Sequence, residues 1–588
     1  MRRLAVWLMA LGLAMTPVAA GAASGNEKDA AATKKEDAKS EAAKKGSETA
    51  KGEQPKANSE LDLEIQQLKD LIQAQSQELE KQREALREQQ ARTEELMKQM
   101  ATMRLTAGQP GVPAEVAATK PGGVIATSGG APGTGVTSVV TGTSNAKSAQ
   151  DEKEPESPLQ FRIGSAYITP VGFMDFTTVW RNHDGGSGIG TNFAGIPYGN
   201  VFANNLSEFR FSMQNSRIGF RVDATVKGAH VIGYMESDFL GNNPGNVAVS
   251  SNSNTLRSRL YWVDVRKGQF EILGGQTWSL ITPGRTGISP LPADIFYTNN
   301  IDVNYQLGLV WGRIPEARFV WHRSDKFAIA AALDSPEQYN GGSAGGPLIT
   351  CPASLNTICT SEFNNGGNTL GVANRAPDII AKAAFDPSKR AHIEFGGVER
   401  QFHDWNPNTL AKFSKTGGGG FLNMNFEVFK GFRLLSNNFW SDGGGRYIFG
   451  QAPDAIIRAD GSISPVHASS TVTGFEYTRG NSLFYGYYGA MYVSRNLAFD
   501  ANGTTPIGYG NTNAASGQNR NVQEITLGFN QTLFKDGKYG ALTFMTQYSY
   551  LSRNPWFIVT GQPEDAHLSM VFLNLRYLLP GSAPTLGK

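Results

Sequence analysis

The stretch from Glu208 to Asp238 alternates apolar and polar side chains over an unusually long distance. Phe209, Phe211 and Met213 occupy every second position, which gives a β-strand one apolar and one polar face. After Ser216 the alternation resumes in the opposite phase, which predicts a β-bulge. Arginines and carboxylates share the polar face, an arrangement typical of a barrel whose outer wall meets lipid and whose inner wall meets water. The stretch therefore predicts a membrane-spanning β-hairpin.

Connections of two lengths divide the region from Phe161 to Leu579 into strands. Short turns are expected at 227–229, 266–268, 324–326, 386–390, 430–431, 479–481 and 534–539. Long polar loops are expected at 181–206, 241–254, 281–312, 336–375, 403–417, 442–468, 496–520 and 553–566. Seven short turns that alternate with eight long loops predict an all-β fold, a 16-stranded antiparallel transmembrane β-barrel over residues 158–580. A soluble all-β protein is the alternative, but it would not sort its loops by length so regularly.

Two further strands show the same alternation. The pattern places Leu256, Leu260 and Trp262 on one face and Arg257, Arg259 and Tyr261 on the other. In the last strand Asn574 and Arg576 are expected to point inward. The residues expected to point outward there are Val571, Leu573, Leu575, Tyr577 and Leu579.

The chain begins with the three parts of a secretory signal peptide, here residues 1–22. Two arginines precede the apolar run Leu4–Met15, and small residues follow it up to Ala22. Export is therefore expected. Residues 23–58 consist mainly of Lys, Glu, Ala and Asp, which predicts a disordered charged segment.

A heptad pattern follows in residues 59–104. Apolar residues such as Ile65, Ile72 and Leu79 recur at one heptad position, while glutamines dilute the other apolar position in the middle of the segment. We predict a coiled coil without fixing the number of its strands, and a single solvated helix is the alternative. Residues 105–157 are rich in Gly, Thr, Ser and Pro and are expected to form a flexible linker, and 581–588 a short tail.

Composition excludes several classes of function. A formal net charge of +2 gives no electrostatic case for nucleic-acid binding. Beyond the N-terminus no apolar run of about 18 residues occurs, as a membrane-spanning helix requires. The seven histidines lie too far apart in sequence for a zinc motif, and no Gly-x-Ser-x-Gly motif is present. We therefore expect no metal, no cofactor and no enzymatic activity. The two cysteines, Cys351 and Cys359, are expected to form a local disulfide.

Four short runs resemble the early strands of general trimeric porins: Asn215–Phe220, Glu236–Phe239, Leu256–Tyr261 and Gly274–Trp278. Together with the N-terminal heptads and the linker, they make the chain similar to the DcaP-like porin group. The resemblance covers residues 158–579. One departure is that many outer-membrane barrels end on an aromatic residue, whereas this chain continues from Pro580 to Lys588.

The resemblance implies a homotrimer of 16-stranded barrels that passes small, often anionic, solutes. It also implies that the third long loop, 281–312, folds inward to narrow the pore and carries Asp294 and Asp302 there. The coiled coil would lie in the periplasm and the barrel in the outer membrane, in contact with its lipid.

The polar faces of the early strands carry a set of arginines. The expected pore-lining cations are Arg210, Arg217, Arg221, Arg257, Arg259 and Arg318. Guanidinium groups stay charged and bind carboxylates with two parallel hydrogen bonds, which suits the attraction of anionic solutes. Glu236 and Asp238 lie on the same faces, so a network of paired charges that only stiffens the wall is the alternative for any single arginine.

Taken together, these features predict a passive diffusion porin of the outer membrane for small hydrophilic, anionic solutes. The alternative is a structural anchor in which the coiled coil binds peptidoglycan or another periplasmic partner and the pore is incidental. An enzyme assembled from distant Ser, His and Asp residues ranks third. The solute, the pore radius and the partner of the coiled coil are not encoded in any motif of the sequence.

Overall fold

The computed structural model describes residues 157–243, 249–250, 252–342, 346–357, 359–360, 363–364 and 374–581. The chain divides into two compact units, Met1–Gly123 and Val124–Lys588, and all described residues belong to the second. The expected signal peptide, charged segment, coiled coil and linker therefore lie outside the described residues. Within the described part of the chain, no helix is both long and apolar enough to cross a membrane.

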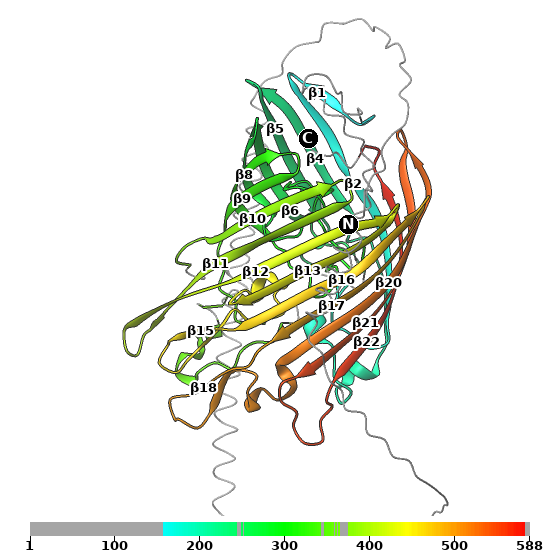
Figure 1. Cartoon of the computed structure of the whole chain (residues 1–588). Coiled ribbons are helices and arrows are strands. Elements are labelled where there is room, and N and C mark those ends of the chain that lie inside the picture. Colours follow the sequence, from blue (N-terminus) through cyan, green and yellow to red (C-terminus); the bar gives the residue numbers. More distant parts are fainter. Residues whose placement is uncertain are drawn as a thin grey trace, which may run out of the picture. The chain divides into compact units, whose positions relative to one another are not determined.

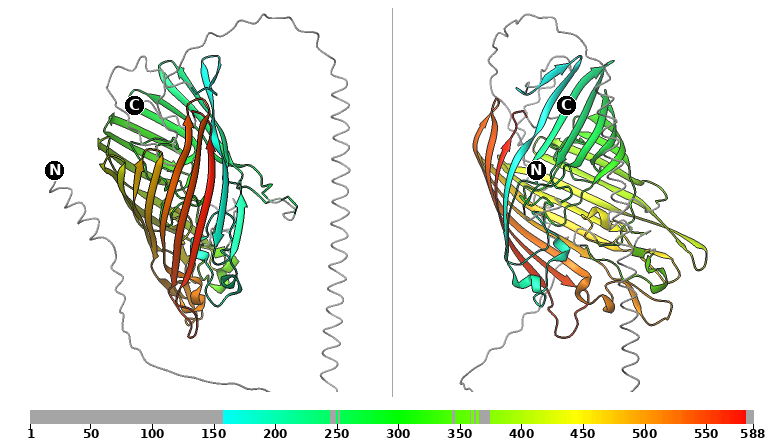
Figure 2. Two further views of the ribbon diagram at one scale, coloured as in Figure 1. Left: turned by 90° about the vertical axis from the view of Figure 1, so that its right-hand side faces the viewer. Right: turned by 180° about the vertical axis from the view of Figure 1, so that it is seen from behind.

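The described residues form an antiparallel sheet that closes on itself where β2 (Ala166–Arg181) pairs with β22 (Ala566–Leu578), as Figures 1 and 2 show. Of its eighteen strands, β1 (Phe161–Ile163) is a short addition at the start of β2. Another two, β3 (Glu208–Ser212) and β4 (Arg217–Val226), pair with successive halves of β2 and act as one strand of the wall. The wall thus has the sixteen strands that the sequence predicts.

The remaining wall strands follow one another around the barrel in chain order. They are β5 (Ala229–Asp238), β6 (Arg257–Lys267), β7 (Phe270–Trp278), β8 (Arg313–Ser324), β9 (Phe327–Asp334), β10 (Asp378–Ser388), β11 (Ala391–Asn406), β12 (Ala411–Phe429), β13 (Phe432–Asp442), β16 (His467–Arg479), β17 (Ser482–Val493), β20 (Asn519–Asp536) and β21 (Gly540–Pro555). Two small hairpins, β14 (Ala455–Ile457) with β15 (Ile463–Pro465) and β18 (Asn496–Phe499) with β19 (Pro506–Tyr509), lie within long loops.

Seven short turns join successive wall strands at one rim of the barrel, and both ends of the described chain lie at that rim. Ser157 donates a hydrogen bond from its Oγ to the carbonyl oxygen of Pro580, 2.9 Å away, which holds the two ends together. Longer connections lie at the opposite rim, which we call the long-loop rim. The predicted sorting of connections by length is therefore confirmed, with one exception.

The predicted long loop at 403–417 is wrong. β11 and β12 continue through it and are separated by four residues, 407–410. The glycines at 417–420, where the predicted loop ends, pair in register with residues 397–400 of β11. Glycine is required here by packing, because a Cβ on Gly417 would lie 2.7 Å from the ring of Phe402. The hairpin projects beyond the rest of the long-loop rim (Figure 1).

The phase slip after Ser216 is confirmed as a break between β3 and β4. Phe209 and Phe211 before it are 57% and 55% exposed, and Ile218 after it is 50% exposed, so both halves keep their apolar side chains outward. The backbone N–H of Asp175 on β2 donates to the Ser216 Oγ at 3.0 Å, which closes the gap that the break leaves in the ladder. An apolar outer face over this length is what a lipid-facing strand requires.

The predicted faces of β6 are partly wrong. Leu260 and Trp262 are buried on the inside, whereas Tyr261 is exposed on the outside. The register shifts between Glu236, which pairs with Leu260, and Ser237, which pairs with Ser258. Arg259 is therefore the extra residue of a β-bulge, and both Arg259 and Leu260 point inward. The bulge adds an aromatic side chain to the inner wall beside the arginines.

The last strand has the predicted faces. Val571, Leu573 and Leu575 are exposed on the outside, while Asn574 and Arg576 are buried inside. The Arg576 Nε donates to Oδ2 of Asp175 on β2 at 2.7 Å, so an ion pair spans the seam where the barrel closes.

Candidate pore constriction

The connection of residues 279–312 between β7 and β8 folds into the barrel, and we call it the inner loop. Its residues are largely buried and contact wall strands that are distant in sequence, including β11, β16, β17, β20 and β21. The inward fold that the resemblance implied for 281–312 is confirmed.

A buried ion pair fixes the first half of the inner loop to β16. The guanidinium group of Arg285 donates to both carboxylate oxygens of Glu476, each at 3.0 Å. The Asn299 amide, also in the inner loop, and the Tyr487 hydroxyl, on β17, donate to the same carboxylate at 2.8 Å. One side chain of the wall thus accepts four hydrogen bonds, three of them from the inner loop.

The second half of the inner loop lies directly against β17 and β20. The backbone N–H of Leu307 donates to the Glu524 carboxylate at 2.8 Å. At Gly489 on β17, a Cβ would lie 1.9 Å from the carbonyl oxygen of Leu307, so only glycine permits this approach. Gly308 has a φ of 87°, a left-handed conformation that favours glycine, and its missing Cβ leaves room for the β16 and β17 backbones.

Two further contacts fix the beginning of the loop. The backbone N–H of Gly284 donates to Glu394 at 3.1 Å, and that of Gly287 donates to Asp386 at 2.9 Å. His392 lies between these two carboxylates, with its ring nitrogens 2.9 Å from Asp386 and 3.2 Å from Glu394. The loop is therefore attached to the wall at its start, middle and end.

The two acidic residues expected in the constriction are buried in the inner loop. The Asp302 carboxylate accepts hydrogen bonds from the Thr191 backbone N–H at 3.3 Å and from the Thr191 hydroxyl at 2.5 Å. Burial raises the pKa of Asp302, and the bonds from Thr191 and from the Asn304 N–H oppose that shift. Asp294 is likewise buried. Asp302 thus links the inner loop to the first long loop.

Five of the predicted pore-lining residues gather on the inner faces of β4, β5 and β6. Arg259 donates to Glu236 at 2.8 Å and to Asp238 at 2.7 Å. Arg257 binds Asp238 with two hydrogen bonds of 3.0 and 2.8 Å and keeps 39% of its side chain exposed. The Arg217 guanidinium lies 3.6 Å from Glu236. Three guanidinium groups therefore face two carboxylates.

Arg313, at the start of β8, adds a fourth guanidinium group to this cluster. It lies 5.6 Å from the ring centre of Trp278 and 5.3 Å from that of Trp311, and within electrostatic reach of Arg257 and Arg259. No carboxylate of the described residues lies within ion-pair distance of it, because Glu236 and Asp238 bind the other three arginines. The guanidinium cluster of Arg217, Arg257, Arg259 and Arg313 thus carries two surplus positive charges.

The inner loop presents aromatic rings to this cluster. Tyr305 has ring centres of Tyr297, Trp311 and Trp278 within 6.0 Å, and Phe449 from a long loop stacks on Trp311. The backbone of Tyr305 has a φ of 65°, which is unusual for a residue with a Cβ. A 3.0 Å hydrogen bond from the Tyr305 N–H to the Asp302 carbonyl oxygen holds this conformation.

The cluster also changes the acidity of these tyrosines. Burial alone would raise the pKa of Tyr305, but the guanidinium groups of Arg217, Arg259 and Arg313 outweigh it and hold the pKa below the usual value. For Tyr297, burial prevails and raises the pKa to about 12.

The other predicted arginines lie elsewhere. Arg210 is at the long-loop end of β3, exposed and 2.9 Å from Glu208. Arg221 is near the short-turn rim and binds Asp223 at 2.7 Å. Arg318 is buried on β8, where it binds Glu316 at 2.5 Å and donates to the carbonyl oxygen of Trp278 at 2.6 Å. The structure does not bring these three into the guanidinium cluster.

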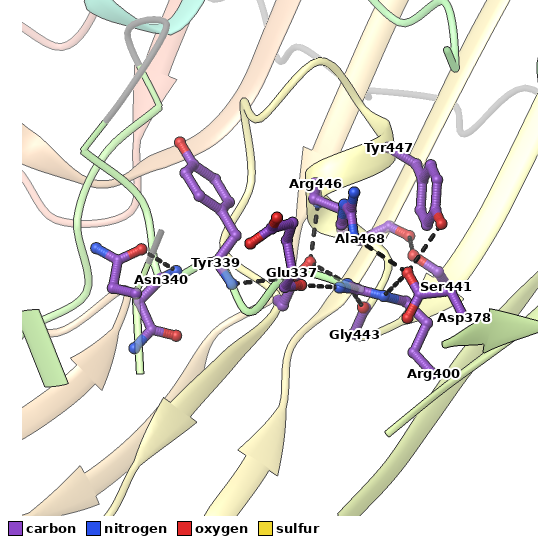
Figure 3. A network of polar contacts seen from close by, with 12 residues as sticks. Glu337, Tyr339, Asn340, Asp378, Arg400, Ser441, Gly443, Arg446, Tyr447 and Ala468 are labelled. Carbon is purple, nitrogen blue, oxygen red and sulfur yellow. Dashed lines mark hydrogen bonds and ion pairs between the residues drawn. The ribbon is translucent and has the colours of Figure 1, made fainter. Parts of the chain in front are cut away.

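A second polar network joins the long loops to the wall (Figure 3). Arg400 on β11 binds Asp378 at 3.0 Å and Asp454 at 2.6 Å, and Arg446 donates to the same Asp378 at 3.2 Å. The Tyr447 hydroxyl also donates to Asp378, at 2.8 Å. Burial raises the pKa of Asp454, and Arg400 opposes that shift. Asp454 and Arg446 belong to the loop after β13, which is thereby held in place.

Cys351 and Cys359 are linked in the loop after β9, with an S–S distance of 1.98 Å. Cys359 is fully buried in an apolar cluster that also contains Leu355 and Phe363 of its own loop and Ile456 and Ile457 of the loop after β13. The link therefore lies where two long loops pack together.

Sequence reasoning missed Arg313, Arg285 and Glu476. Arg285 lies within the expected inner loop and Arg313 directly after it, so their position was a usable signal. Glu476 alternates with apolar neighbours on a predicted strand, but nothing local indicated a partner 191 residues away.

Comparisons with known proteins agree with the architecture. The outer membrane channel DcaP of Acinetobacter baumannii matches with a TM-score of 0.51 and 16% identity, over 70% of this chain and 97% of that one. The chain has the fold of a DcaP-like porin. This confirms the predicted resemblance at the level of fold. No family model and no curated protein matches the sequence.

Two further solved structures cover the same region. OprB of Pseudomonas putida is 11% identical over 70% of this chain and 94% of its own, and OmpT of Vibrio cholerae is 8% identical over 71% and 99%. Both have a TM-score of 0.38, which is too low to support an inference about this chain.

Proposed function

We propose that this protein is a passive diffusion channel of the outer membrane that admits small hydrophilic solutes and favours anions. The observation that carries the proposal is the surplus of two positive charges in the guanidinium cluster beside the inner loop. Unneutralised charge at the narrowest part of a pore selects ions of the opposite sign. The inner loop narrows the barrel there, and the mechanism needs no coupling to energy.

Unsatisfied hydrogen-bond donors at the cluster support the preference for anions. Nη2 of Arg259 and Nε1 of both Trp278 and Trp311 have no acceptor among the described residues, although all three atoms are buried. A passing solute does not touch these atoms, but their uncompensated dipoles add to the positive potential that an anion in the lumen meets.

The test is the reversal potential of the purified protein in a planar bilayer under a potassium chloride gradient. A unit charge about 8 Å from a permeating ion in water is worth about 0.5 kcal/mol and acts with opposite sign on anion and cation. Arg257→Gln or Arg313→Gln should therefore lower the ratio of anion to cation permeability by up to about fivefold.

Arg210→Gln is the matched control, because that exposed arginine lies at the long-loop end of the barrel and outside the cluster. A wild-type channel that is unselective or prefers cations would refute the proposal. So would an equal loss of selectivity in the control variant.

We extend the proposal to a homotrimer whose coiled coil lies in the periplasm. The outer face of β2 and β3 supports it, because the rings of Phe176, Phe209 and Phe211 pack into an exposed apolar cluster that a neighbouring protomer would cover in place of lipid. Native mass spectrometry of the folded protein in detergent tests this state, and a monomer mass at every concentration would exclude it.

A further inference from the structure

Each of the seven short turns carries at least one exposed lysine or arginine. Lys227, Lys267, Lys326 and Arg390 lie on the first four turns. Lys430, Arg479 and Lys538 lie on the last three. We call these seven residues the basic rim. They surround the barrel instead of gathering on one side, because the turns follow one another around the wall.

Three carboxylates near this rim are engaged by other groups. Asp223 binds Arg221 and His230, Glu271 binds His322, and Asp386 binds His392. Among the described turn residues, the exposed acids are Asp325 and Asp536, and Asp536 accepts from the backbone N–H groups of Lys538 and Tyr539. The basic rim therefore keeps a large excess of positive charge.

Exposed aromatic side chains fix the depth of the basic rim. Phe270 and Phe429 lie beside the second and fifth turns, and Tyr539, which is 61% exposed, lies beside Lys538 on the seventh. Aromatic residues of transmembrane barrels form belts at the boundary between hydrocarbon and headgroups. Side chains one or two residues beyond such a belt lie at the level of the lipid phosphates, and lysine and arginine can extend to reach them.

The opposite rim has a smaller excess. Its exposed charges include the cations Arg210, Arg375, Lys412, Lys415, Arg458, Arg495 and Arg520 and the acids Asp442, Asp460 and Glu564. The charge asymmetry therefore separates the two membrane surfaces. A ring of cations matches a partner that surrounds the barrel, whereas a single bound protein would need one concentrated patch.

We propose that the basic rim binds the phosphate groups of anionic phospholipids. In barrels of this architecture the short turns face the periplasm, so these lipids belong to the inner leaflet of the outer membrane. Lysine and arginine near an anionic lipid surface attract it with an energy that falls off within a Debye length. The proposal does not depend on the channel function, because the rim lies at the other end of the strands from the guanidinium cluster, as Lys267 and Arg257 at opposite ends of β6 show.

The test uses the full-length protein reconstituted in vesicles of phosphatidylcholine with a minor fraction of spin-labelled lipid. Electron spin resonance measures the fraction of label immobilised by the protein, for phosphatidylglycerol and for phosphatidylcholine in turn. The rim variant combines Lys227→Gln, Lys267→Gln, Lys326→Gln and Lys430→Gln. The matched control removes four exposed cations of the opposite rim through Lys412→Gln, Lys415→Gln, Arg458→Gln and Arg520→Gln.

The wild type should prefer phosphatidylglycerol, and the rim variant should lose at least about half of that preference, whereas the control should keep it. High salt should abolish the preference in the wild type, which tests the proposal even where a variant does not fold. Equal immobilisation of the two lipids, a preference that resists salt, or an equal loss in the control variant would overturn the proposal. An unchanged single-channel conductance in the rim variant would show that lipid binding at the rim and conduction through the channel are independent.

Discussion

Glu476→Gln should detach the inner loop from the wall. The Glu476 carboxylate is 2% exposed and accepts two hydrogen bonds from Arg285, one from Asn299 and one from Tyr487. The substitution removes the negative charge and leaves the Arg285 guanidinium buried without a counter-charge. Breaking a buried ion pair by removing one partner costs about 3–5 kcal/mol. The free energy of unfolding should fall by that amount.

The same change should alter the current through the channel. A cost of about 3–5 kcal/mol raises the population of a detached loop by roughly two to three and a half powers of ten. Single-channel recordings should therefore show larger conductance levels or rapid switching that the wild type lacks. Guanidinium chloride titration of the folded protein in detergent measures the stability in parallel.

Glu208→Gln is the matched control. Glu208 binds Arg181 at 2.6 Å and Arg210 at 2.9 Å, but neither partner belongs to the inner loop. It should lower stability without changing the conductance levels. The double variant Arg285→Met with Glu476→Leu should recover most of the stability, since apolar residues of similar size often replace a buried pair without loss. If Glu476→Gln costs less than about 1 kcal/mol and leaves the recordings unchanged, the ion pair does not hold the loop.

Two further outcomes are expected. The pKa of Tyr305 is held below the usual value, so Tyr305 should ionise at a lower pH than an ordinary tyrosine. Its ionisation adds a negative charge to the cluster. The anion preference of the channel should therefore fall as the pH rises, with a midpoint below about pH 10. Tyr305→Phe should remove that step from the pH dependence of the reversal potential. Tyr297→Phe should leave the step in place, because the pKa of Tyr297 is about 12. Reduction of the bond between Cys351 and Cys359 should lower the free energy of unfolding by about 2–3 kcal/mol, given the short loop it closes. Denaturation with and without reductant measures this effect, and Cys351→Ser with Cys359→Ser should abolish the response to reductant.

The wall of the barrel could be predicted because a period of two assigns each residue to one of two faces. That rule placed Phe209, Ile218 and Arg576 correctly. It failed from Leu260 to Trp262, because Arg259 is an extra residue that reverses the phase and no change in residue type marks the bulge. The loop prediction also failed at 403–417, where β11 and β12 continue to pair and Gly417 leaves room for the ring of Phe402.

The constriction could be predicted less well, because its geometry depends on contacts across the barrel. The sequence correctly predicted that Arg217, Arg257 and Arg259 line the same part of the inner wall, because the register of adjacent strands alone brings them together. It could not show that Asp302 turns towards Thr191, or that Arg285 meets Glu476 from across the barrel. Those contacts follow from the path of the inner loop, for which local patterns carry no signal.

The charges inside the barrel divide into two groups with different consequences. Arg285, Arg400 and Arg576 are bound by buried carboxylates, so each contributes to the attachment of a loop or the closure of the wall and adds little net field. Arg313 has aromatic rings as its neighbours in place of a carboxylate, so its charge remains available to a solute. Stability and selectivity should therefore respond to different substitutions. Arg313→Gln should change selectivity at nearly constant stability. Glu476→Gln should lower stability and change the conductance levels through the inner loop, because a paired charge stabilises the structure while a surplus charge acts on the permeating ion.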